Sequence, residues 1–259
     1  EDEILSFKEF NNIFDKIMVH SSFKHKMINR LQWYYQQILK ITFVINFINQ
    51  KKEKIIIWDA DTIITKKINF FNNDSSIKYG TLFEHHKPYY ITLKSIFSYL
   101  PKYFISSLTQ FASMTKNECN FLLRLLKIYD IQNKDLARKL SNIILKNVQE
   151  SHKTYSSSLF SEYELIGISK ILNNKTKQKA IFTLRSGLSG QLTKNQFLIA
   201  KIFNVYHVTY EHSHFNNNSR YMLDRNQNWF LFIKLLIKFY PRFFFKNIIH
   251  NFKYLFINS

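Results

Sequence analysis

Glycine, proline, cysteine and acidic residues are all scarce in this chain of 259 residues. The four glycines and three prolines exclude collagen-like and linker-like proteins, while a 46% share of hydrophobic residues is enough to build a buried core. The single cysteine, Cys119, excludes an internal disulfide framework and a cysteine-based zinc cluster, and it favours a reducing compartment. We therefore expect a globular, cytoplasmic protein.

Long apolar stretches are absent as well. The richest one, residues 229–245, is interrupted by Lys234, Lys238 and Arg242, so it falls short of the roughly 18 apolar residues that a transmembrane helix needs. Residues 226–259 interleave aromatic and basic side chains, which suits helices lying on an anionic membrane, with packing against the protein as the alternative. We expect a main domain over residues 1–225 and peripheral attachment to the inner face of the cytoplasmic membrane through residues 226–259.

Positive charge dominates, because 37 Lys and Arg residues against 18 Asp and Glu residues leave a net charge of +19. Codon drift in an AT-rich genome explains part of this charge, since Asn, Lys, Ile and Phe are all over-used. The other explanation is an anionic partner such as a nucleotide, a phospholipid surface or nucleic acid. A non-enzymatic nucleic-acid-binding module would account for the charge directly, but the basic residues are spread along the chain and no recognised motif of that kind is present.

Apolar spacing and capping signals predict four helices. The first begins at Asn29 and continues to Ile48, with most of its surface buried. The second begins at Thr115 and the fourth at Ser161, where a Glu three residues further on completes a capping box in each case. The third helix covers residues 134–149.

Three short apolar runs predict strands. Residues 55–58, an Ile-Ile-Ile-Trp run bounded by polar clusters, are typical of a central parallel strand. Residues 180–184 and 205–210 are expected to form strands too, and the turn-rich stretch 69–90 to form loops with one short strand. Strands that alternate with helices, and that end in polar residues, indicate an α/β sheet with its site along one rim.

Asp59 and Asp61 follow the first of these strands and are the sharpest chemical signal. Two carboxylates where the chain leaves a strand can turn toward one divalent cation, Mn²⁺ or Mg²⁺, while a diphosphate supplies further oxygens. The alternative is that both only cap a turn. The pattern also fits a phosphatase of the haloacid dehalogenase type with Asp59 as nucleophile, although Thr62 falls one place early and no later paired aspartate is present.

Four segments together resemble a largely uncharacterised family of bacterial glycosyltransferase-like proteins. They occur in the family's order: a Trp-Tyr-Tyr-Gln-Gln helix at 31–40, Trp-Asp-Ala-Asp-Thr at 58–62, His-Lys-Pro-Tyr at 86–89 and Phe-Ser-Glu-Tyr-Glu-Leu-Ile-Gly at 160–167. The departure is Ile166, where the pattern usually has Tyr. The family resembles the GT-A fold, a Rossmann-like mixed sheet flanked by helices.

The resemblance implies a metal-dependent glycosyltransferase that moves a sugar from a nucleotide-sugar donor to a saccharide or lipid-linked acceptor in surface polysaccharide synthesis. A GT-A fold has a nucleotide-binding βαβ half before its Asp-x-Asp motif, and such a unit takes roughly 30 or more residues. Here one helix and its approach occupy most of the stretch before Asp59. We therefore expect the first strand or strands to be absent and the chain to begin inside its domain.

The resemblance also implies a set of metal ligands. Asp61 would be a direct ligand, Asp59 would orient the ribose or share the metal, and a late histidine would complete the set. His212 and His214 both lie just past the last predicted strand. We favour His212 because it follows that strand more closely, and a plain surface position is the alternative for either histidine.

An inverting transfer needs a general base, and Glu162 and Glu164 are the candidates. Glu164 stands where a capping glutamate would bond back to the Ser161 amide, so a structural role is its alternative. Glu162, in the first turn, is our preferred base, with a favourable position near the helix dipole as its alternative.

Four further residues are expected to contact the donor. Arg185 follows a strand and Lys87 stands in His-Lys-Pro, and these two are the natural cations for a diphosphate leaving group, although either could be a solvated surface charge. Gln36 and Gln37 share one buried helix, where they would hydrogen-bond the Asp-x-Asp loop or the sugar.

Overall fold

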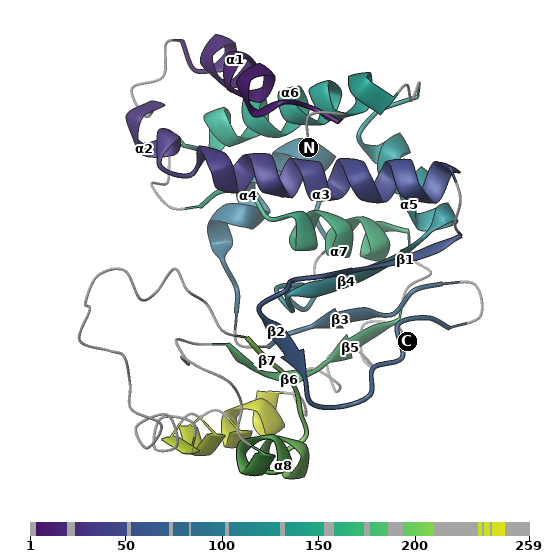
Figure 1. The fold of residues 1–259 in the computed structure, drawn as a ribbon, viewed down its shortest axis with the longest axis vertical. Helices are drawn as coiled ribbons and strands as arrows, with labels where there is room; N and C mark the ends of the chain where they lie inside the picture. Colours follow the sequence, from purple (N-terminus) through teal and green to yellow (C-terminus); the bar gives the residue numbers. More distant parts are fainter. Residues whose placement is uncertain are drawn as a thin grey trace.

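The computed structural model describes residues 4–19, 24–50, 53–72, 75–82, 84–101, 104–129, 133–152, 158–173, 177–185 and 194–209, together with 233–234, 236–238 and 240–246. Within these residues the fold is mixed α/β, with a layer of helices over several small sheets (Figure 1). The predicted fold class is therefore confirmed at the level of α/β.

Seven helices build the upper layer of Figure 1 and enclose the larger hydrophobic core. The helix at its centre, α7, is buried from its first residue through Lys170, so it contacts neighbours on every side. The long helices α3 and α6 pack against one another, and α7 packs against α3, α4 and α5. The seven are α1 (Phe7–Ile17), α2 (Lys24–Ile28), α3 (Leu31–Gln50), α4 (Lys87–Phe97), α5 (Lys116–Leu125), α6 (Asn133–His152) and α7 (Glu162–Leu172).

The four predicted helices are present as α3, α5, α6 and α7. At the start of α5 both halves of the capping box form: Thr115 accepts from the Glu118 N–H, and Glu118 accepts from the Thr115 N–H at 2.8 Å. At the start of α7 the Ser161 side chain accepts from the Glu164 N–H, but the Glu164 carboxylate binds elsewhere. The helices α1, α2 and α4 were not predicted, nor was a helix at residues 194–202; α4 begins after His86 with Pro88 in its first turn.

Within the described residues, seven short strands form three small sheets. The strands β1 (Lys54–Trp58) and β4 (Phe111–Thr115) pair antiparallel, and β3 (Lys78–Gly80) pairs parallel with β5 (Gln178–Ala180). The third sheet has the order β2-β7-β6, from β2 (Thr62–Ile64), β7 (Val205–Thr209) and β6 (Phe182–Arg185). In that sheet β2 runs antiparallel to β7, whereas β6 runs parallel to it.

The prediction of a central parallel strand at residues 55–58 was wrong. The strand β1 is antiparallel to β4 and belongs to a two-stranded sheet within the described residues. Ile57 is buried while Ile56 is 44% exposed, so one face of the strand packs against the protein and the other meets solvent. This alternation is typical of an antiparallel strand that is covered on one face only. The sequence does not reveal it, because residues 55–57 are all isoleucine and no polar residue marks the exposed position.

The residues predicted to form one strand, 180–184, belong to two strands instead. Residues 178–180 pair with β3, and 182–185 pair with β7, so Ile181 lies between two sheets. The predicted strand at 205–210 is present as β7, and the stretch 69–90 contains the expected short strand, β3.

A second, smaller core lies at the lower end of Figure 1. It joins the sheet β2-β7-β6 with α8 (Lys194–Ile202) and with C-terminal residues. The described residues between 233 and 246 are helical, and Leu236, Tyr240 and Phe243 pack into this core. No helix in the described ranges is long and apolar enough to cross a membrane.

Candidate functional site

The Asp-x-Asp turn is fixed by backbone bonds at both of its ends. The Asp59 N–H donates to the Gln110 carbonyl at 3.0 Å, and the Asp59 carbonyl accepts from the Thr62 N–H at 3.1 Å. The Trp58 indole N–H donates to the Thr62 carbonyl at 3.0 Å. The turn therefore connects β1 to β2 tightly and leaves Asp61 exposed, with the Thr62 hydroxyl 3.4 Å from its carboxylate.

Lys40 brings the turn and the start of α7 together. Its ammonium on α3 lies 2.5 Å from Asp59 Oδ1 and 2.9 Å from Glu162 Oε1. We call these three residues the Lys40 cluster. In the sequence Glu162 is 122 residues from Lys40 and Asp59 is 19 residues from it, and the three converge because α3 packs against both β1 and α7.

The charges of the Lys40 cluster do not cancel. Burial alone would lower the pKa of Lys40, but the charges of Glu162 and Asp59 outweigh it and raise that pKa. Burial raises the pKa of Glu162, and Lys40 opposes the shift. Burial and the charges of Asp59, Glu162 and Asp61 raise the pKa of Tyr163. Within the cluster two carboxylates face one ammonium, which leaves a net negative charge when all three groups are ionised.

Gln37 also joins α3 to α7. Its side-chain carbonyl accepts from the Glu162 N–H at 3.1 Å, and its buried Nε2 has no hydrogen-bond partner among the described residues. The expected contact with the Asp-x-Asp loop is thus replaced by a contact with the first turn of α7. Gln36, one residue earlier, is exposed.

Glu164 lies on α7 two residues after Glu162 but in a different environment. Its Oε1 accepts from the Tyr90 hydroxyl at 2.8 Å, the Ser106 hydroxyl at 2.6 Å and the Ser107 N–H at 3.0 Å. The side chain is completely buried. These contacts favour the structural alternative for Glu164, since they leave it no approach from solvent.

The remaining predicted residues are spread more widely. Lys87 is exposed at the first position of α4. Arg185 is the last residue of β6. It pairs with Thr209 of β7, which pairs in turn with Thr62 of β2, the residue that follows Asp61 in the sequence. His212 and His214 lie outside the described residues.

Sequence reasoning missed Lys40 itself. The signal was present, because Gln37 and Lys40 are three residues apart and therefore share one face of a buried helix. It also missed Lys78 and Lys170, which are both buried. Burial lowers the pKa of Lys78 to about 7 and that of Lys170 to about 8. The Lys78 ammonium donates to the Ile105 carbonyl.

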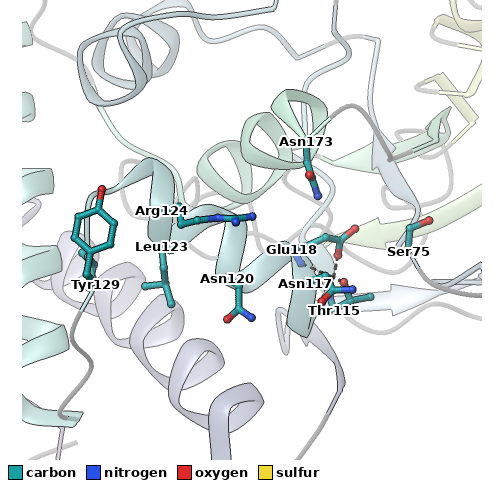
Figure 2. A pocket seen from close by; sticks show the side chains of 10 residues that line it. Ser75, Thr115, Asn117, Glu118, Asn120, Leu123, Arg124, Tyr129 and Asn173 are labelled. Carbon is teal, nitrogen blue, oxygen red and sulfur yellow. Dashed lines mark hydrogen bonds between the residues drawn. The ribbon is translucent and has the colours of Figure 1, made fainter.

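A separate cavity of about 530 Å³ lies at the start of α5 (Figure 2). Arg124 and Asn173 extend toward its interior in that view, and Tyr129 lies at one side. It adjoins the end of β4 that pairs with Lys54, whereas Asp59 follows the opposite end of β1. The cavity is therefore not part of the Lys40 cluster.

Few side chains in the described residues are placed to bind a metal ion. Within the described ranges, no group of three or more His, Cys, Asp or Glu side chains is arranged to hold a metal ion. Asp59 and Asp61 offer carboxylate oxygens, the ligands that Mn²⁺ and Mg²⁺ prefer, and they need oxygens from a ligand to complete a shell. None of the known protein families, curated proteins or solved structures compared with the chain matches it.

Proposed function

We propose that this protein is a metal-dependent glycosyltransferase with a GT-A-like fold, acting on a nucleotide-sugar donor. The observation that carries the proposal is the Lys40 cluster, which joins the Asp-x-Asp turn to the predicted base, Glu162. Separate segments with the chemistry of metal binding and of proton transfer thus meet at one place. The acceptor would be a saccharide or a lipid-linked saccharide in surface polysaccharide synthesis, at the inner face of the cytoplasmic membrane.

The metal would be Mn²⁺ or Mg²⁺, held by Asp59 and Asp61 together with the donor's diphosphate. Bound there, it would neutralise charge on the leaving diphosphate. The Lys40 cluster supports this role, because its two carboxylates carry more charge than its single ammonium. A late histidine, His212 or His214, would be a further ligand, and Arg185, in one row with Thr209 and Thr62, would contact the diphosphate with Lys87 and Gln36.

Glu162 would accept the proton of the acceptor hydroxyl. The acceptor oxygen then forms a bond to the anomeric carbon of the sugar, and the bond to the nucleoside diphosphate breaks. Burial raises the pKa of Glu162, which makes it a stronger base than an exposed carboxylate. Lys40 and Gln37 would position it, through the ion pair at 2.9 Å and the bond to its N–H at 3.1 Å.

The phosphatase alternative has less support. It places Asp59 at the end of a parallel strand, and β1 is antiparallel to its partner β4. A nucleic-acid-binding module stays an alternative that the net charge of +19 alone suggests.

The test combines binding and turnover. Calorimetry with nucleoside diphosphates, with and without Mn²⁺, measures the donor site, and release of nucleoside diphosphate from a panel of nucleotide sugars measures the reaction. Asp61→Asn should abolish Mn²⁺-dependent binding, while Glu162→Gln should keep binding and lose turnover. Asp135→Asn, whose side chain is 52% exposed on α6, is the matched control and should behave as the parent.

Three outcomes would contradict the proposal. The first is nucleoside diphosphate binding that ignores Mn²⁺ and survives Asp61→Asn. The second is phosphate release from monoesters that depends on Asp59, which would establish the phosphatase. The third is salt-sensitive nucleic-acid binding without any affinity for nucleoside diphosphates, which would establish the binding module.

A further inference from the structure

Exposed apolar side chains gather at one end of the molecule, on two helices. Leu198 and Ile202 on α8 are 59% and 68% exposed, and they are four residues apart on one helical face. Ile237 is 68% exposed and Phe244 is 57% exposed on the C-terminal helical residues. A water-facing cluster of such large side chains indicates a surface that binds something apolar.

The two helices belong to the same end of the fold because they share a core. Ala200 of α8 and Leu236 are buried in the same hydrophobic cluster, and the rings of Phe203 and Tyr240 lie 5.2 Å apart. Figure 1 shows α8 and the C-terminal helical residues side by side at the lower end. Their exposed side chains therefore lie at the same end of the fold, and we call them together the α8 surface.

The charge of the α8 surface has one sign. Residues 194–209 and 233–246 contain no acidic residue. The stretch 177–185 contains none either. The exposed charged side chains among the described residues of the two helices are all basic: Lys194, Lys201, Lys234, Lys238, Arg242 and Lys246. A second copy of the same surface would place positive charge against positive charge, so the complementary partner is anionic.

An open surface cavity of about 470 Å³ adjoins the α8 surface where α8 meets the end of β2. Three lysines line it, Lys66, Lys67 and Lys201, together with the ring of Phe197. The Lys66 ammonium donates to Asn204 at 2.7 Å, and the Lys201 ammonium lies 4.7 Å from the Phe197 ring centroid. We call this the lysine cavity, and its donors suit the phosphate of a lipid headgroup.

We propose that the α8 surface binds an anionic phospholipid bilayer, with a headgroup phosphate in the lysine cavity and the exposed Leu, Ile and Phe side chains at the acyl boundary. Apolar side chains next to cations match the two layers of a membrane interface. Nucleic acid would satisfy the lysines but would leave the aliphatic side chains against polar groups. The inference deepens the membrane location proposed above, and it extends the predicted C-terminal segment to α8 and to the lysine cavity.

Vesicle flotation tests the proposal without donor, metal or acceptor, so it can fail while the glycosyltransferase proposal holds, and the reverse. The full chain should float with phosphatidylcholine vesicles that contain phosphatidylglycerol and should stay unbound with phosphatidylcholine alone. Lys67→Gln with Lys201→Gln should weaken binding about 25-fold, since each basic residue near an anionic surface contributes about five-fold. Leu198→Ser with Ile202→Ser should weaken it on the order of ten-fold.

Matched controls replace the same residue types elsewhere. Lys94→Gln on α4 and Phe43→Ser on α3, where Phe43 is 52% exposed, should leave flotation unchanged. Urea unfolding of each variant checks that its fold is intact. Equal flotation of surface and control variants would overturn the proposal, as would binding of inorganic phosphate without vesicle binding, or a salt-resistant dimer that does not float.

Discussion

Replacing Gly167 with alanine is expected to destabilise the protein by at least about 2 kcal/mol. A Cβ at this position of α7 would overlap the Ser107 hydroxyl, and it would lie 2.6 Å from Ser107 Cβ and 3.0 Å from Lys78 Cε. Alanine in a helix is about 1 kcal/mol more favourable than glycine, so the intrinsic propensity acts in the opposite direction. The clash prevails because Ser107 Cβ moves only with its backbone, and Glu164 holds that backbone through the Ser107 N–H at 3.0 Å.

Urea unfolding followed by circular dichroism measures the effect. Gly167→Ala combined with Ser107→Gly removes the two closest contacts and should recover at least half of the loss, whereas Ser107→Gly alone should cost less than Gly167→Ala. A Gly167→Ala variant as stable as the parent, or more stable, would refute the close packing of α7 on residue 107, because no large clash would then oppose the helix propensity of alanine.

Three further predictions concern charge and capping. Burial lowers the pKa of Lys78 to about 7 and of Lys170 to about 8, so above about pH 7 the unfolded chain binds more protons than the folded one. Unfolding free energy should therefore rise with pH from about 7 to 9, and Lys78→Met should flatten that rise; a parent whose stability falls over this range contradicts the assignment. Lys40→Met should leave Asp59 and Glu162 without their cation and cost about 1–3 kcal/mol in urea unfolding, with Lys40→Arg closer to the parent. Thr115→Ala should remove a formed cap and lower stability by about 1 kcal/mol in thermal unfolding, and no change in melting temperature would count against the capping box.

The helices were the most predictable part of the structure. Apolar spacing and capping residues act within one turn of the chain, so Thr115 and Ser161 marked the starts of α5 and α7 correctly. The sequence predicted that Asp59 and Glu162 belong to one site, but it placed that site along the rim of a parallel sheet, and β1 is antiparallel to β4. In the structure the two carboxylates meet at Lys40, which that prediction did not include.

Strand pairing was the least predictable part, since it depends on residues far apart in the sequence. The Ile-Ile-Ile run at 55–57 favours a strand but does not say whether its partner is parallel, and β4 was not recognised at all. The buried lysines were hidden for a similar reason. Lys78 and Lys170 look like surface charges until the packing around α7 shows that solvent does not reach them.

The pairing of β2 with β7 has a consequence for the order of assembly during synthesis. Residues 62–64 can pair only after residues 205–209 have been made, while the described residues of the larger core end at Leu172. A growing chain can therefore complete its helical layer first and close the long β2–β7 contact last, which is an entropically slow step. Because the hydroxyls of Thr62 and Thr209 join across that contact at 3.1 Å, the turn that bears Asp59 and Asp61 would gain its final support only when β7 has left the ribosome.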